Sequence, residues 1–166
     1  MPIAVVTGAG RGLGAELVTA LRRAGYDVVA TDIAGAADVL DVTDADACRA
    51  LAQRVQPDVW INNAGVLGAG DAATQPDATV EQIIGVNLLG TIHGTRAAVE
   101  VMRQRDGGRG RGHVITIGSL ASWVPVPGEC IYAATKAGVL SFTLGLEAEL
   151  RAQGVVGMHF TVICPD

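Results

Sequence analysis

Short apolar runs alternate along the chain with longer segments in which apolar positions recur every three or four residues. The runs are rich in Val and Ile, and most are followed by Gly, Asp or Asn, which is typical of buried strands in a parallel sheet. We expect strands over residues 3–7, 27–31, 39–40, 59–61, 113–117 and 156–164. The segments with helical spacing predict helices over residues 13–24, 45–55, 79–104 and 132–153.

This alternation predicts an α/β fold, a Rossmann-like doubly wound parallel sheet lying between two layers of helices. No internal repeat, linker or change of composition marks a second domain, so we expect residues 1–166 to form one dinucleotide-binding domain. Thr43 and Asp44 are candidate N-caps of the second helix, and Thr79 is a candidate N-cap of the third. The glycine-rich segment 106–112 predicts a turn ahead of the fifth strand.

Composition narrows the class of protein. The 166 residues are 49% hydrophobic and 17% charged, which excludes an intrinsically disordered chain. The net charge of −5 argues against a nucleic-acid surface and against polybasic attachment to lipid. No signal peptide and no membrane span is predicted, and three scattered cysteines indicate a reducing compartment, so we expect a cytoplasmic protein. The three histidines lack ligand spacing, and no metal site is expected.

A glycine-rich loop follows the first predicted strand. Gly10-x-Gly12-x-x-Ala15 satisfies the dinucleotide fingerprint, in which glycines bring the backbone close to a pyrophosphate at a helix N-terminus. Asp32 ends the second strand 20 residues after Gly12, where a carboxylate can bind the ribose hydroxyls of adenosine. That carboxylate repels a 2′-phosphate and favours NAD over NADP, whereas Arg11 would attract such a phosphate. The alternative is a glycine turn that only tightens the packing of helix against strand.

Tyr132 and Lys136 are four residues apart in a predicted helix and project from one face. Lys136 is the only lysine of the chain, and an ammonium beside a phenol stabilises the phenolate form. Tyr132 is therefore a candidate general acid/base for an alcohol or carbonyl oxygen. Ser119, just past the fifth strand, could bind the same oxygen. Judged alone, this pattern also fits a surface Tyr–Lys pair and a Ser that caps a turn.

Five motifs occur together in one order. They are Thr7-Gly8-x-x-x-Gly12-x-Gly14, Asn62-Asn63-Ala64-Gly65, Asn87, Ser119 and Tyr132-Ala133-Ala134-Thr135-Lys136. In order and spacing the chain resembles the short-chain dehydrogenase/reductase family from Ile3 to Pro165. The resemblance implies hydride transfer between a nicotinamide cofactor and a small secondary alcohol or ketone. It also implies assembly into a homodimer or homotetramer through the long helices.

The resemblance assigns a role to each matching residue. Tyr132 would be the catalytic acid/base, Lys136 would stabilise its phenolate and hold the nicotinamide ribose, and Ser119 would polarise the substrate carbonyl. Asn87 would hold a water that connects Lys136 to solvent. The remaining cofactor contacts are the pyrophosphate loop of Gly8, Arg11, Gly12 and Gly14, then Leu13 near the nicotinamide, Asp41 and Val42 at the adenine, and Asn63, Ala64 and Gly65 after the fourth strand.

Alternatives to a dehydrogenase remain open at this point. An epimerase or a dehydratase of the same family would use the same tyrosine, and a nucleotide-binding protein without catalysis belongs to a different class. Absence of net NADH formation across many alcohols would favour the first alternative. NADH binding without turnover of any substrate would favour the second.

The sequence departs from the family pattern in two places. Only eight residues separate Asp32 from Asp41, which predicts either a very short third strand or a tight loop in place of a helix. The sequence also ends at Pro165-Asp166, where relatives continue with a segment that covers the substrate and a seventh strand. We therefore expect the printed sequence to be part of a longer chain, with the sixth strand at an open edge.

Overall fold

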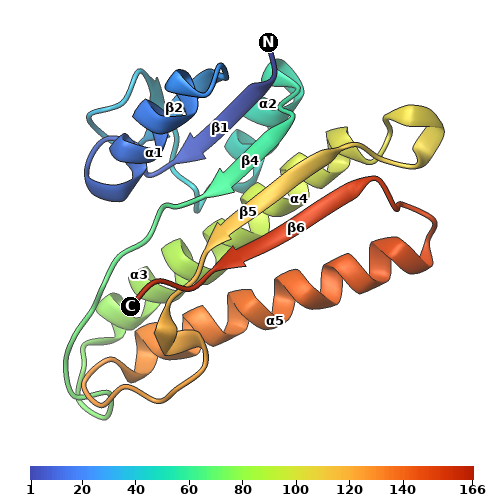
Figure 1. The fold of residues 1–166 in the computed structure, drawn as a ribbon. Coiled ribbons are helices and arrows are strands. Elements are labelled where there is room, and N and C mark those ends of the chain that lie inside the picture. The colour runs from blue at the N-terminus through green and yellow to red at the C-terminus, as the bar shows by residue number, and fades with distance from the viewer.

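Six parallel strands form one sheet in the order β3-β2-β1-β4-β5-β6 in a computed structural model that describes residues 1–166 (Figure 1). The strands are β1 (Ile3–Thr7), β2 (Asp27–Asp32), β3 (Asp38–Val39), β4 (Val59–Asn62), β5 (Gly112–Ile117) and β6 (Met158–Ile163). The chain moves outward from β1 to β3, returns to β4 beside β1, and then moves outward in the other direction. The predicted doubly wound parallel sheet is confirmed, and β6 forms one of its edges.

The helices lie close to their predicted ranges. They are α1 (Gly12–Arg23), α2 (Ala45–Val55), α3 (Asp77–Ile84), α4 (Gly90–Met102) and α5 (Cys130–Ala152). Short 3₁₀ turns, η2 (Asp106–Gly108) and η3 (Leu120–Ser122), flank β5. Asp44 caps α2 as expected, since its carboxylate accepts from the backbone N–H groups of Asp46 and Ala47.

The predicted helix over 79–104 differs in its start and in its middle. It begins at Asp77, after Pro76 as N-cap, so Thr79 lies inside the first turn and caps nothing. Five residues in its middle, η1 (Gly85–Leu89), form a π-helical turn between α3 and α4. Such turns are rare and often occur at functional sites. This one places Asn87 inside the protein, where only 1% of it is exposed.

Alternation of side chains along the strands builds a core on each face of the sheet. Val5, Trp60 and Val114 face the side covered by α2, α4 and α5, where the larger core lies. Val6 and Ile61 face the other side and pack with α1 in a smaller core. The two layers of helices predicted from the sequence are therefore present.

The connection between the end of β2 and Asp41 contains one very short strand and no helix. β3 has only two residues, which pair with Thr31 and Asp32, and no helix separates it from β2. Both consequences anticipated from the eight-residue spacing therefore occur together. The loop brings Asp32 and Asp41 to the same edge of the sheet.

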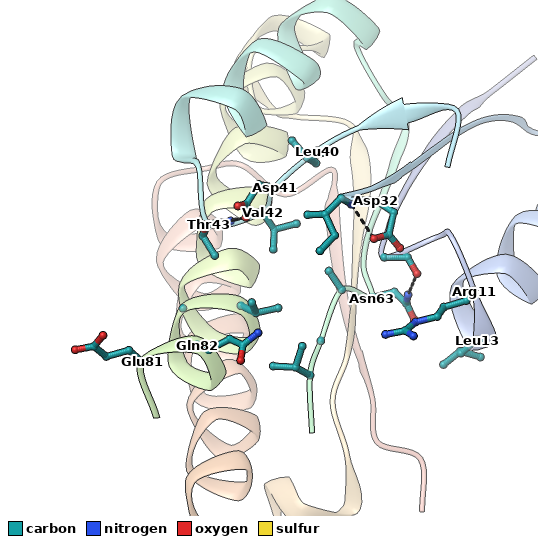
Figure 2. Close-up of a pocket in the computed structure, with 18 residues that line it drawn as sticks. Arg11, Leu13, Asp32, Leu40, Asp41, Val42, Thr43, Asn63, Glu81 and Gln82 are labelled. Atoms are coloured by element: carbon teal, nitrogen blue, oxygen red, sulfur yellow. Dashed lines mark hydrogen bonds between the residues drawn. The ribbon is translucent and has the colours of Figure 1, made fainter. Parts of the chain in front are cut away.

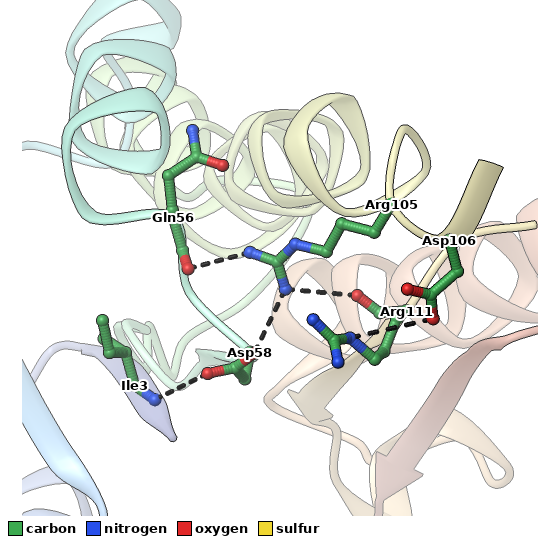
Figure 3. A network of polar contacts seen from close by, with 6 residues as sticks. All are labelled: Ile3, Gln56, Asp58, Arg105, Asp106 and Arg111. Atoms are coloured by element: carbon green, nitrogen blue, oxygen red, sulfur yellow. Dashed lines mark hydrogen bonds and ion pairs between the residues drawn. The ribbon is translucent and has the colours of Figure 1, made fainter. Parts of the chain in front are cut away.

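An arginine joins several elements at the opposite, amino-terminal edge of the sheet (Figure 3). The Arg105 guanidinium donates to the backbone carbonyls of Gln56 (2.8 Å) and Arg111 (3.2 Å) and to the Asp58 carboxylate (3.3 Å). Asp58 in turn accepts from the backbone N–H of Ile3 at 2.9 Å. This cluster connects the start of β1, the segment before β4 and the turn before β5, far from the carboxyl ends of the strands.

Candidate active site

The glycine loop lies at the carboxyl end of β1 and leads into α1. Gly8 has a φ of +65°, and a β-carbon there would lie 2.6 Å from the Ala64 α-carbon. Gly12 has a φ of +56°, but a β-carbon there would meet nothing within 4 Å. Gly14 differs from Gly12 in having no space for a side chain. A β-carbon there would collide with the Gly8 carbonyl and the Asn63 side chain. Gly8 and Gly14 thus permit close packing, and Gly12 borders open space.

The N-terminus of α1 has no side-chain cap. Arg11 occupies the N-cap position with an extended backbone, and its side chain makes no capping hydrogen bond. The first N–H groups of α1 are therefore free of side-chain partners. Such groups, with the positive end of the helix dipole, form a ready site for an anion.

Asp32 holds the loop in place. Its Oδ2 accepts from the backbone N–H of Gly10 at 2.9 Å, and its Oδ1 accepts from the N–H of Ile33 at 2.7 Å. Each carboxylate oxygen has two lone pairs, so the group keeps acceptor capacity for a ligand. Sequence reasoning anticipated Asp32 as a ligand-binding acid but missed its second role, which is to accept a hydrogen bond from Gly10 and so fix the glycine loop.

The hydroxyl of Thr7 joins the ends of β1 and β4. It accepts from two successive backbone N–H groups, those of Asn63 and Ala64, both at 3.1 Å, and donates to the Ile61 carbonyl at 3.3 Å. The Asn63 side chain returns to β1 and donates to the carbonyls of Thr7 and Gly8 at 2.9 Å. The point where the strand order reverses is therefore held by side-chain hydrogen bonds. In sheets of this type, ligands bind at that point.

A cleft of about 840 Å³ opens at this switch point (Figure 2). Figure 2 shows Arg11, Leu13 and Asp32 on one side of it, and on the other Gln82 of α3 with Asp41 and Val42 above it. All predicted cofactor residues of the loop and strand ends line it except Gly14, which lies behind the loop: Gly8, Arg11, Gly12, Leu13, Asp32, Asp41, Val42, Asn63, Ala64 and Gly65. Sequence reasoning missed the other residues that line the cleft: Ile33, Leu40, Thr43, Val66, Glu81, Gln82, Gly85 and Val86.

Ser119, Tyr132 and Lys136 line a second cavity of about 310 Å³. Leu13, Asn63, Gly65 and Val66 line this cavity as well as the larger cleft. The two spaces are therefore neighbours that share one wall. The three residues come from the end of β5 and the first turns of α5, so a segment of thirteen residues folds back on itself to bring them together.

Lys136 lies beneath the Tyr132 ring. Its Nζ is 5.6 Å from the ring centroid and donates to the Ile117 carbonyl at 2.7 Å. The residue is 94% buried, its exposed fraction being 6%. Burial lowers the pKa of the Lys136 ammonium to about 8, while the nearby Cys164 thiol acts in the opposite direction. The lysine thus sits beside the phenol without being paired to a carboxylate.

The Ser119 hydroxyl has one donor already bound to it. Ser119 is the N-cap of η3, and its Oγ accepts from the backbone N–H of Ala121 at 3.1 Å. The capping role considered for this serine is therefore real. Accepting that bond leaves the O–H of Ser119 available to donate to a further oxygen, because a hydroxyl both donates and accepts.

Asn87 does not line either cavity. Its side chain is bound to the backbone of Val66, and its Nδ2 also lies 3.4 Å from the Thr135 hydroxyl. A β-carbon on Gly65 would lie 3.4 Å from the Asn87 Oδ1 and 3.9 Å from the Lys136 Nζ. Asn87 and Lys136 therefore approach Gly65 from the same direction. Sequence reasoning missed Val66 and Thr135, since neither stands out by residue type.

No helix is long and apolar enough to cross a membrane. The family described as short chain dehydrogenase has a model that matches residues 2–166. A relative from Mycobacterium tuberculosis, described as a probable oxidoreductase EphD, is 35% identical over 96% of this chain and 30% of its own. The 2-keto-3-deoxy-L-fuconate dehydrogenase of Xanthomonas campestris is 34% identical over 97% of this chain and 56% of its own.

Two solved structures have the same fold. A short-chain dehydrogenase from Streptomyces avermitilis aligns with a TM-score of 0.88 at 26% identity, over 99% of this chain and 65% of that one. Serine dehydrogenase from Escherichia coli aligns with a TM-score of 0.87 at 30% identity, over 98% of this chain and 82% of that one. The chain thus spans about a third to just over half of the two curated relatives. Family model, relatives and solved structures agree that this chain belongs to the short-chain dehydrogenase family.

Proposed function

We propose that the protein transfers a hydride between a nicotinamide cofactor and a secondary alcohol or ketone, with Tyr132 as the general acid/base. One observation carries the proposal: Ser119, Tyr132 and Lys136 line a single cavity that shares its wall with the glycine-loop cleft. A substrate oxygen in that cavity is within reach of the groups that move its proton. A dinucleotide in the cleft would end beside the shared wall. Residues 1–166 would act in this reaction as one domain.

The residues of the cleft fit a dinucleotide. The uncapped N-terminus of α1 and the open space at Gly12 suit a pyrophosphate. Asp32 suits the adenosine ribose, and Asp41 and Val42, which line the same end of the cleft, suit the adenine. Leu13 and Gly65 lie at the shared wall and suit the nicotinamide end. When bound, the nicotinamide would accept or supply the hydride.

The protein would handle the proton. During alcohol oxidation Tyr132 takes the hydroxyl proton as the hydride leaves the carbinol carbon, and during reduction it returns that proton to the carbonyl oxygen. Ser119 donates a hydrogen bond to the same oxygen and orients it. Lys136 favours the phenolate by its charge and donates to a ribose hydroxyl, a role that its position beside the Tyr132 ring supports. Asn87 fixes the loop that separates the two spaces.

Replacement of the phenol tests the assignment. Tyr132→Phe should lower kcat by about 100-fold or more, because general acid/base catalysis is typically worth that much. NADH binding should change little, since the ring remains. Tyr26→Phe is the matched control, because Tyr26 is the only other tyrosine and lines neither cavity. Activity is measured by following NADH formation with a panel of secondary alcohols, polyols and hydroxysteroids. Turnover by Tyr132→Phe at the wild-type rate would refute the role of this residue.

We further propose that NAD is preferred over NADP. The Asp32 carboxylate would repel a 2′-phosphate, and its hydrogen bond to Gly10 fixes it at the cleft. Arg11 lines the same cleft and favours NADP, so the preference depends on both residues. Asp32→Asn should narrow the ratio of NADH to NADPH affinity by about tenfold, equivalent to removing one unfavourable charge contact. An unchanged ratio would contradict the proposal.

Self-association is the last part of the proposed function. The family resemblance implies assembly through the two long helices, and here α5 exposes Leu144 while the π-helical turn η1 before α4 exposes Leu89. Apolar side chains on such helices favour a homodimer or homotetramer. Sedimentation of the full chain as a monomer at micromolar concentration would contradict this part and leave the reaction untouched.

A further inference from the structure

Four large apolar side chains are exposed in two segments that each contribute a lining residue to the cavity of Tyr132, Leu67 in one and Ser119 in the other. Leu67 is 63% exposed, Leu120 49%, Trp123 65% and Val124 45%. We name these four residues the apolar rim. They come from the segment after β4 and from the segment between β5 and α5. Exposed apolar side chains that gather at one place mark a binding surface, because single ones scattered over a protein need no such explanation.

Backbone contacts join the two segments that carry the rim to each other and to that cavity. Leu67 lines the cavity directly, together with Ser119 and Tyr132. Leu120 follows Ser119, and its N–H donates at 2.7 Å to the carbonyl of Pro165, another lining residue. The N–H of Gly70 donates to the Gly128 carbonyl at 2.8 Å, so the two segments that carry the rim are joined. Leu67 and Leu120 therefore border the space that a reacting carbon would occupy, and Trp123 and Val124 follow Leu120 in the same segment.

Charge in the cavity restricts what can react there. Among its lining residues only Lys136 and Asp166 carry charged side chains. The Lys136 Nζ already donates to the Ile117 carbonyl, and the proposed function commits it to the cofactor. None of the eleven arginines of residues 1–166 lines the cavity, so these residues offer no bidentate partner for a carboxylate. An anionic group next to the reacting carbon would meet Asp166 and no cation of residues 1–166 other than Lys136.

We propose that the substrate is an uncharged secondary alcohol or ketone with an apolar chain, which lies on Leu67, Leu120, Trp123 and Val124 while its oxygen meets Tyr132. This inference rests on the proposed function for the position of the oxygen. The rim adds binding energy in proportion to the apolar area it covers, so each methylene of the chain that it covers should raise kcat/KM about threefold to fourfold. A carboxylate in place of the methyl group beside the carbinol carbon should abolish this increase in kcat/KM with chain length.

Binding can be measured without turnover. Trp60 and Trp123 are the only tryptophans, and Trp60 is fully buried, so a ligand on the rim changes the emission of Trp123 alone. In the full-length Tyr132→Phe variant with NAD present, 2-octanol should shift the emission to shorter wavelength and saturate. Its counterpart 2-hydroxyoctanoate, which carries a carboxylate in place of the methyl group beside the carbinol carbon, should bind at least tenfold more weakly. Trp123→Phe added to that variant should remove the signal.

Three results would overturn the inference: no shift with 2-octanol, a shift that survives Trp123→Phe, or equal binding of the hydroxy acid. A failure of the proposed function gives a different pattern, in which 2-octanol binds but the wild-type protein shows no Tyr132-dependent turnover. The two ideas are therefore tested separately.

Chain-length dependence gives a second test with a matched control. Val124 and Val156 are both valines with nearly equal exposed fractions, 45% and 47%. Val156 lies between α5 and β6 and lines neither cavity. Val124→Ala should lower kcat/KM for 2-octanol about threefold to fourfold and leave 2-butanol unchanged. Val156→Ala should leave both unchanged. Equal effects of Val124→Ala on the two alcohols, or of the two variants on 2-octanol, would contradict the placement of the chain.

Discussion

The side chain of Asn87 binds both polar groups of the Val66 backbone. Its Oδ1 accepts from the Val66 N–H at 2.8 Å, and its Nδ2 donates to the Val66 carbonyl at 2.9 Å. An amide side chain thus replaces the strand partner that the backbone loses as it leaves β4. Val66 lines both cavities, so this pair fixes the wall between them.

Asn87→Ala should therefore act on stability and on cofactor binding together. Two backbone groups lose their partner, which should lower the free energy of unfolding by about 1–3 kcal/mol and raise the KM for the cofactor. Urea unfolding and steady-state kinetics of the full chain measure the two effects. Gln75→Ala is the control, since Gln75 makes only a 3.4 Å contact to Gly68 in the same loop. Wild-type stability of Asn87→Ala would show that the pair contributes nothing.

Burial of Lys136 predicts a specific dependence of stability on pH. The pKa of this ammonium is about 8 in the folded protein, below its ordinary value of 10.5. Above pH 8 the folded state has released the proton while the unfolded state still binds it. The free energy of unfolding should therefore rise between pH 8 and 10.5, by up to about 3 kcal/mol relative to a Lys136→Met variant.

Comparison of the two proteins in denaturant across this pH range removes the contribution of the groups that are distant from Lys136. If the free energy of unfolding varied with pH in the same way in both proteins, Lys136 would keep an ordinary pKa in the folded state. The measurement uses the protein without cofactor, because a bound ribose hydroxyl would alter the surroundings of the ammonium.

Two glycines in helices should respond in opposite directions to alanine. A β-carbon at Gly14 would collide with the Gly8 carbonyl, whereas one at Gly145 would meet nothing within 4 Å. Gly14→Ala should destabilise the protein by about 1–3 kcal/mol, as overpacking does. Gly145→Ala should stabilise it by about 0.5–1 kcal/mol, because alanine favours the interior of α5. Thermal unfolding of both variants checks the pair, and the same sign for both would be the contrary result.

Two ion pairs at the protein surface should differ in how much they contribute to the free energy of unfolding. Arg105 has 15% of its side chain exposed and binds two carbonyls besides Asp58 (Figure 3). Arg54 pairs with Asp38 at 2.8 Å but is 61% exposed. Arg105→Met should cost about 1–3 kcal/mol because it leaves three acceptors without a partner, whereas Arg54→Met should cost less than about 1 kcal/mol. Equal costs in urea would show that burial of the guanidinium does not matter here.

The sequence predicted the parts of this molecule that depend on local pattern. β-Branched runs followed by Gly, Asp or Asn defined the strands, and the spacing of Tyr132 and Lys136 placed both on one face of α5. The sheet order and the shared wall of the two cavities depend on contacts between distant segments, which no local pattern reports. The π-helical turn at 85–89 was missed because α3, the eight residues before it, is too short to show that the extra residue shifts the phase of the apolar positions. The start at Asp77 was missed because Pro76, unlike a Ser or Thr cap, carries no side-chain acceptor.

The π-helical turn at 85–89 also sets the rotation of α4 relative to α3. Removing one residue there would restore ordinary helical winding, and everything beyond the deletion would rotate by about 100° relative to what precedes it. Either Asn87 would leave the interior, or Ala97, Ala98 and Met102 would turn away from the larger core. An insertion or deletion is therefore excluded at this point, although single substitutions on its exposed side are tolerable. The length of the segment, as much as its composition, is a determinant of the site.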